Sequence, residues 1–165
     1  MNRTIRVAAV QMASQLGDTD ANLACAEQWI EQAAARHAQL VLLPELMPGG
    51  YGLTEAIWQA AEPFEGKSMA WLKVTAKRHN IFLGTTFLEC EGEEFYNTFV
   101  LINPQGELAG RVRKSPPASV EAYFYRAGED VHYIDTELGR MGVAICYESL
   151  LYSHILAFHQ AGVDL

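Results

Sequence analysis

The sequence predicts an α/β protein in which a mixed sheet is covered by helices. A strand–helix–strand pattern opens the chain, an antiparallel meander occupies the middle, and strand-like and helical segments alternate again near the end. The chain has 165 residues, of which 50% are hydrophobic and 19% charged, as in a folded protein with one sizeable core. We therefore expect a single domain over residues 1–165.

Periodicity defines the elements of the first half. Apolar residues at helical spacing predict two amphipathic helices, over 21–37 and 66–79. Apolar runs predict strands before, between and after these helices, at 5–12, 40–43 and 81–88. Strands joined through helices are expected to run parallel in one sheet.

The second half begins with tight turns. Residues 91–94 and 103–106 are rich in turn-forming residues, which predicts an antiparallel meander with strands at 95–102 and 107–113. A long loop, 115–130, follows.

Two more strands are predicted at 131–135 and 139–145, and a helix at 150–160. The last residues, 163–165, resemble the start of another strand. We therefore expect the chain to be a fragment whose C-terminal part is missing.

Charge and cysteine content narrow the class of protein. The net charge of −8 disfavours binding to nucleic acid or to an anionic membrane surface. No stretch has the length of a membrane span, and none has the pattern of a signal peptide. Three cysteines without Cys-x-x-Cys spacing indicate a reducing compartment, so we expect a cytoplasmic protein, and they disfavour a zinc site.

Cys146 is the candidate nucleophile. The segment "GRMGVAICYES" is a predicted strand that runs into Cys146 just before a helix. Backbone N–H groups and the helix dipole at such a corner favour thiolate, the reactive form. The alternative is a small buried side chain, the usual fate of a free cysteine. Cys25 and Cys90 have no comparable setting and are expected to be structural.

Glu45 is the candidate base. None of the histidines has the setting of a base, and we expect structural or surface roles for all five: His37, His79, His132, His154 and His159. A buried carboxylate can replace histidine, because burial disfavours its charged form. In "LVLLPEL" four apolar residues, expected to be interior, lead through Pro44 to Glu45 at the carboxyl end of a strand. The alternative is that Glu45 sits in solvent.

Lys114 and Glu121 are two further candidates. Lys114 ends a predicted strand, where an inward ammonium would stabilise negative charge, and Glu121 could hold Lys114 or the substrate. The alternative is that both are surface charges, as most such residues are.

These residues and their surroundings resemble the nitrilase, or carbon–nitrogen hydrolase, superfamily. The similarity spans nearly the whole chain and rests on five segments in the family's order: "VAAVQM", "LVLLPEL", "YNTFVLINPQGELAGRVRK", "EAYFYRAGED" and "GRMGVAICYES". The resemblance implies a four-layer α-β-β-α sandwich with mixed sheets, incomplete here because the family's chain is longer. It also implies a homo-oligomer.

The resemblance further implies that small amides or nitriles are cleaved through a cysteine thioester. Glu45 would be the general base, Lys114 would stabilise the tetrahedral intermediate, and Cys146 would be the nucleophile. Glu121 would help to position the substrate, and Tyr51 and Tyr147 are substrate-contact candidates beside catalytic positions. No metal or organic cofactor is implied.

Departures from the family's pattern keep alternatives open. Lys114 is followed by Ser115-Pro116-Pro117 in place of x-His-Leu, and the residues after Cys146 lack the Arg and Pro of many amidase-like members. The Cys-Trp-Glu of many true nitrilases is also absent, which favours an amide over a nitrile. The competing interpretations are a non-catalytic remnant that acts through protein–protein contacts and, with less support, a thiol redox sensor.

Overall fold

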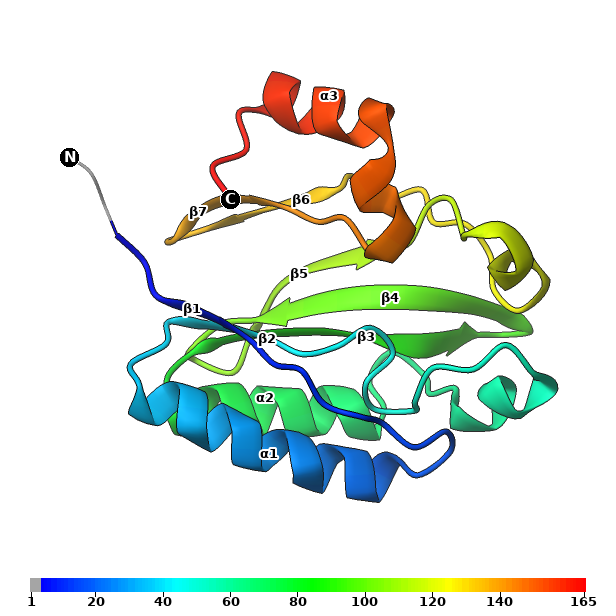
Figure 1. Ribbon diagram of the computed structural model, residues 1–165, viewed down its shortest axis with the longest axis horizontal. Coiled ribbons are helices and arrows are strands. Elements are labelled where there is room, and N and C mark those ends of the chain that lie inside the picture. The colour runs from blue at the N-terminus through cyan, green and yellow to red at the C-terminus, as the bar shows by residue number, and fades with distance from the viewer. Residues whose placement is uncertain (1–3) are drawn as a thin grey trace.

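The computed structural model describes residues 4–165 and arranges them in four layers (Figure 1). Helices α1 (Thr19–Ala35) and α2 (Lys67–His79) form the outer layer on one side. A five-stranded sheet covers them, the hairpin β6–β7 lies over the opposite face of this sheet, and α3 (Tyr152–Ala161) is outermost. The α-β-β-α order confirms the predicted fold class.

The five-stranded sheet is mixed, as predicted, and its order is β1-β2-β3-β4-β5. The strands are β1 (Val7–Ala9), β2 (Leu40–Leu42), β3 (Phe82–Glu91), β4 (Glu94–Ile102) and β5 (Leu108–Arg113). The first three pair in parallel because a helix crosses back between them, and the last three pair antiparallel because tight turns join them.

The main core lies between this sheet and the two helices. Helix α1 contributes Leu23, Ala26 and Ile30, and α2 contributes Met69, Leu72 and Ala76, the faces expected from their spacing. The Asp18 carboxylate caps α1 by accepting a hydrogen bond from the Ala21 N–H at 3.1 Å. Among residues 4–165, no helix combines the length and the apolar character needed to cross a membrane.

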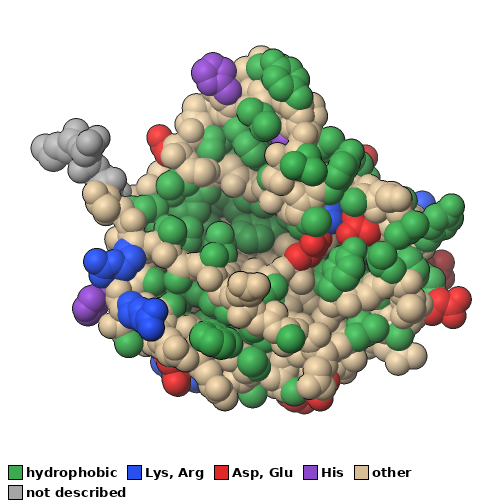
Figure 2. All heavy atoms as spheres, in the orientation of Figure 1, with side chains coloured by type: hydrophobic (Ala, Val, Ile, Leu, Met, Phe, Trp, Pro, Cys, Tyr) green, Lys and Arg blue, Asp and Glu red, His purple; other side chains and the backbone are tan. Residues whose placement is uncertain are grey.

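A second apolar cluster joins the sheet to the hairpin of β6 (Tyr133–Thr136) and β7 (Gly139–Gly142). Its buried members from the sheet are Leu40, Phe82, Leu101 and Val112, and those facing them are Ile134, Met141, Val143 and Ile145. The two layers do not close completely. A cavity of about 300 Å³ remains between them, visible in Figure 2 as a hollow lined by hydrophobic side chains.

Four local predictions were wrong. The strand expected at 139–145 ends at Gly142, and the helix expected at 150 begins at Tyr152 because a 3₁₀ helix, η3 (Cys146–Leu150), comes first. The loop 115–130 contains a second 3₁₀ helix, η2 (Ser119–Tyr123). Leu42 is 38% exposed rather than interior, because its side chain faces the cavity.

Residues 163–165, predicted to begin another strand, are not assigned to one, but the backbone of residues 164 and 165 forms hydrogen bonds with β7. The N–H groups of Asp164 and Leu165 donate to Arg140 O at 2.8 and 3.3 Å, and Leu165 O accepts from Gly142 N–H at 2.9 Å. These bonds place residues 164 and 165 alongside β7.

We expect Leu72→Ala to lower the free energy of unfolding by about 2–5 kcal/mol, because Leu72 is fully buried between α2 and the sheet. Val74→Ala in the same helix is the control. Val74 is 57% exposed, and its truncation should change the free energy by less than about 0.5 kcal/mol. Urea denaturation followed by circular dichroism measures both, and equal effects would contradict the packing described.

Candidate active site

Glu45 lies in a turn after β2 that is held on both sides by β3. The Thr85 hydroxyl donates to Pro44 O at 2.9 Å, and the Leu46 N–H donates to the Thr86 hydroxyl at 2.6 Å. Leu46 has φ +51, a left-handed conformation that reverses the chain just past the carboxylate. These contacts leave the Glu45 side chain only 20% exposed, which excludes the alternative of a fully solvated residue.

Lys114 follows β5 and is fully buried. Its backbone N–H donates to Asn97 O at 2.8 Å, which continues the pairing of β4 with β5 by one residue. Its Nζ lies 2.8 Å from Glu45 Oε1 and 2.8 Å from Glu121 Oε2. The Asn97 amide donates to the same Glu45 oxygen at 2.7 Å. One ammonium is thus shared by two carboxylates from different parts of the chain.

The charges of this cluster support one another. Burial opposes the charged form of Lys114, but its hydrogen bonds to Glu121 and Glu45 outweigh burial, and the net effect raises the pKa of Lys114. Burial likewise opposes ionised Glu121, but the hydrogen bond and charge of Lys114, together with the hydrogen bond from the Ala118 N–H and other contacts, outweigh burial and lower the pKa of Glu121. Ammonium and carboxylate therefore both stay charged at neutral pH.

Glu121 is fixed by η2 and contacts Tyr51. Its Oε2 accepts a hydrogen bond from the Ala118 N–H at 2.6 Å, and its Oε1 accepts one from the Tyr51 hydroxyl at 3.0 Å. Burial and this contact with Glu121 raise the pKa of Tyr51. Tyr51 therefore remains a hydrogen-bond donor at the edge of the cluster.

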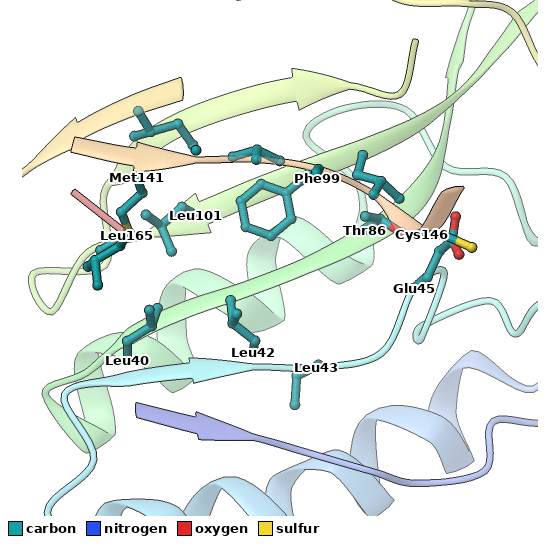
Figure 3. Close-up of a pocket in the computed structure, with 15 residues that line it drawn as sticks. Leu40, Leu42, Leu43, Glu45, Thr86, Phe99, Leu101, Met141, Cys146 and Leu165 are labelled. Carbon is teal, nitrogen blue, oxygen red and sulfur yellow. The ribbon is translucent and has the colours of Figure 1, made fainter. Parts of the chain in front are cut away.

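Cys146 is the first residue of η3 and has φ +53. Non-glycine residues rarely adopt this conformation, and such strain concentrates at functional sites. Cys146 is exposed and lines the same cavity as Glu45. Figure 3 shows the thiol and the Glu45 carboxylate at one end of that cavity, with Leu40 and Leu165 toward the other.

The structure thus assembles most of the residues predicted from sequence. Glu45, Lys114, Glu121 and Tyr51 form one hydrogen-bonded cluster, and Cys146 adjoins it across the cavity end. The remaining substrate-contact candidate and the two other cysteines are not part of this cluster. Tyr147 is exposed and does not line that cavity, whereas Cys25 and Cys90 are partly buried elsewhere. The roles of these residues in catalysis stay predictions.

Two polar residues of the site were missed. Asn97 sits in the apolar strand segment "YNTFVLI", and a buried amide in such a strand must find a partner, which is the signal that points to it. Glu148 is also fully buried, two residues beyond Cys146. Nothing in its local sequence separates it from an exposed glutamate.

Within residues 4–165, one group has the side chains of a metal site. Potential ligand atoms of His132, Glu148 and His154 lie within 4.8 Å of one another. However, both Glu148 oxygens accept backbone N–H groups, and His132 Nδ1 donates to Val143 O at 3.3 Å. Glu148 and His132 Nδ1 therefore already have hydrogen-bond partners, whereas the buried His154 Nδ1 has none in the described part of the chain.

The four layers define the class of α-β-β-α sandwich proteins, and comparison with known proteins narrows it. The sequence model of the carbon–nitrogen hydrolase family matches residues 6–165 of this chain. The chain belongs to this family, which confirms the resemblance seen in the sequence.

Individual relatives agree with this assignment. Nitrilase 1 of Arabidopsis thaliana is 31% identical over 182 residues, an alignment that covers 98% of this chain and 53% of the relative. A nitrilase of Pyrococcus abyssi is 32% identical over 149 residues, covering 87% of this chain and 56% of the relative. The chain therefore spans about half the length of the curated relatives it matches.

Solved structures show the same fold. Nit3 of Saccharomyces cerevisiae, a member of the nitrilase superfamily, matches with a TM-score of 0.84 and 28% identity over 96% of this chain and 61% of its own. An amidase from Nesterenkonia sp. AN1 matches with a TM-score of 0.87 and 22% identity over 97% of this chain and 64% of its own. In a variant of that amidase, acrylamide has added to the active-site cysteine.

The pH dependence of stability in the variant Glu121→Gln tests whether the ion cluster stabilises the fold. Folding lowers the pKa of Glu121 below its ordinary 4.5, so its carboxylate stabilises the fold above pH 4.5, and this contribution is lost as pH falls through the folded value. We expect the free energy of unfolding to fall more steeply below pH 4.5 in the wild type than in Glu121→Gln.

Urea denaturation from about pH 7 down to about pH 3 measures this difference. Glu55→Gln, at an exposed glutamate in η1 (Glu55–Ala60), is the matched control and should keep the wild-type slope. Identical slopes in all three proteins would contradict a lowered pKa of Glu121 in the folded state.

Proposed function

We propose that this chain carries the catalytic residues of a hydrolase that cleaves the carbon–nitrogen bond of a small amide through a cysteine thioester. The observation that carries the proposal is the buried Lys114 ammonium between Glu45 and Glu121, beside the cavity that Cys146 lines. Family membership supports it, since the relatives that match are named as nitrilases and amidases.

The first half of the reaction forms the thioester. Glu45 takes the proton of the Cys146 thiol, and the sulfur attacks the carbonyl carbon of the amide. The carbonyl oxygen becomes an oxyanion in the tetrahedral intermediate. This collapses with cleavage of the carbon–nitrogen bond, and Glu45 returns its proton to the departing nitrogen, so that ammonia leaves.

The oxyanion has a donor nearby. An ammonium has three N–H bonds, and those of Lys114 to Glu45 and Glu121 use two of them, so the third can point to the oxyanion. The backbone N–H of Tyr147 is a second donor, because the first amides of a helix have no partner within it. In the second half, water attacks the thioester and gives a proton to Glu45, the acid leaves, and the Cys146 thiol is restored.

The substrate class has two candidates. The residues after Cys146 favour an amide, whereas similarity to Nitrilase 1 of Arabidopsis thaliana favours a nitrile. We propose Glu121, Tyr51 and Tyr147 as substrate-contact residues in either case. Homo-oligomer formation and a cytoplasmic location stay predictions.

Alkylation rates test the proposed nucleophile without a substrate. In native protein, iodoacetamide should label Cys146 faster than Cys25 or Cys90. Glu45→Gln should slow only the labelling of Cys146, by about 100-fold, the lower end of what a positioned base contributes. Peptide-resolved mass spectrometry gives the three rates, and equal rates in the wild type would contradict a poised thiol.

Turnover is tested by ammonia release from a panel of small amides and nitriles, with Cys146→Ala as the inactive control. Release from amides, lost in Cys146→Ala, is the expected result. Release from nitriles alone would select the second candidate. A rapidly labelled Cys146 with no release from any compound would favour the non-catalytic alternative.

A further inference from the structure

Glu148 is a fully buried carboxylate that the proposed reaction does not use. Each of its oxygens accepts a hydrogen bond from a different stretch of backbone. Oε1 accepts a short one from the Ser115 N–H, and Oε2 accepts one from the Ile145 N–H at 2.6 Å. Glu148 therefore ties together two segments that lie 30 residues apart in the chain.

Both donors adjoin residues of the proposed reaction. Ser115 directly follows Lys114, and Ile145 directly precedes Cys146. Lys114 follows β5 of the five-stranded sheet, whereas Cys146 lies between β7 and α3, the elements that cover the other face of this sheet. The carboxylate of Glu148 is thus a polar link between the layer that holds the ammonium and the layer that holds the thiol.

The position of Cys146 needs such support. Its φ of +53 is strained for a residue with a side chain, and strain of this kind persists only where the surroundings hold it. Glu148 fixes the residue before Cys146 through Oε2, and its own backbone N–H donates to Ile145 O at 3.2 Å. The two contacts hold Ile145, the residue on the N-terminal side of Cys146, in place.

The surroundings of Glu148 show that these amides are its principal partners. Among the described residues, its ion-pair partners are His132 and His154, whose ring nitrogens each lie 3.8 Å from Oε1, beyond hydrogen-bond distance. The two imidazole rings meet edge to face, with centroids 4.6 Å apart. A buried carboxylate is costly unless its oxygens are satisfied, and here backbone N–H groups satisfy both.

We propose that Glu148 is a positioning residue that sets the thiol of Cys146 relative to Lys114 and Glu45 by binding the backbone on each side of the site. The inference rests on the proposed role of Cys146 as nucleophile. It predicts that the increase in Cys146 reactivity provided by Glu45 depends on Glu148, although no hydrogen bond joins the two carboxylates.

Glu148→Gln is the direct test. It preserves the size of the side chain but places an NH₂ group against one of the two N–H donors. We expect it to slow iodoacetamide labelling of Cys146 by about tenfold, a size typical of couplings between contacting groups. Cys25 and Cys90 should label at wild-type rates, which reports an intact fold.

Glu62→Gln is the matched control. The Glu62 carboxylate also accepts a backbone N–H, that of Ser68 at 2.7 Å, but it lies at the start of α2, in the opposite outer layer from Cys146. This variant should leave the labelling of Cys146 unchanged. An equal slowing in Glu62→Gln and Glu148→Gln would overturn the inference.

A double variant separates positioning from general destabilisation. If Glu148 aligns the thiol with Glu45, then Glu45→Gln should have an effect about tenfold smaller in the Glu148→Gln background than in the wild type. An undiminished effect of Glu45→Gln would show that Glu148 serves only the stability of the fold, and would overturn the inference.

If Glu148→Gln does not fold, amide hydrogen exchange of the wild type provides an independent test of the inference. The N–H groups of Ser115 and Ile145 should exchange at least about 100-fold more slowly than in an unfolded chain. Unprotected amides at either position would overturn the inference. The proposed function fails separately, if Cys146 of the wild type labels no faster than Cys25 and Cys90.

Discussion

The structure of the site depends on the ammonium of Lys114, buried between two carboxylates. Each partner arrives from a different element: Glu45 from the turn after β2, Lys114 from the end of β5, and Glu121 from η2. Removing one member of a buried ion cluster leaves an uncompensated charge, which is far more costly than the cluster itself. The three segments are therefore fixed relative to one another by electrostatics as well as by packing, and the cavity end they surround has a defined shape.

The charge balance of this cluster also constrains the proposed chemistry. Two carboxylates and one ammonium carry a net charge of −1 before the thiol reacts. Releasing the thiol proton to solvent would add a second negative charge to the cluster. Transfer of that proton to Glu45 keeps the total constant, because a thiol and a carboxylate become a thiolate and a carboxylic acid. A carboxylate close to Cys146 therefore suits this site better than a remote base.

Sequence periodicity was enough to predict a mixed sheet covered by helices, because the helices and strands bury the faces that their spacing marks. The four-layer order was implied only by the family resemblance. Local sequence marked Glu45, Lys114 and Cys146 as candidates, because each follows a predicted apolar strand, but their catalytic roles were implied by the family resemblance. Local sequence failed where a residue's role depends on distant backbone. Glu148 binds an amide 33 positions earlier, and Asn97 binds a carboxylate 52 positions earlier, so neither partner is visible locally. The left-handed Cys146 was missed for the related reason that an unexpected 3₁₀ helix interrupts the predicted passage from strand to helix.

Some residues of the apolar core also line the cavity of the proposed active site. Leu40, Leu101 and Met141 belong to the apolar cluster between the two layers and also line the cavity. The ammonium and both carboxylates are placed by the sheet and its loops, whereas the thiol is placed by the opposite layer, so the distance between them is set by how these layers pack. Apolar contacts are not directional, so they keep the layers apart but do not fix the orientation of one layer relative to the other. The hydrogen bonds of Glu148 are directional and cross between the layers at the site itself. They supply the alignment that apolar packing cannot provide.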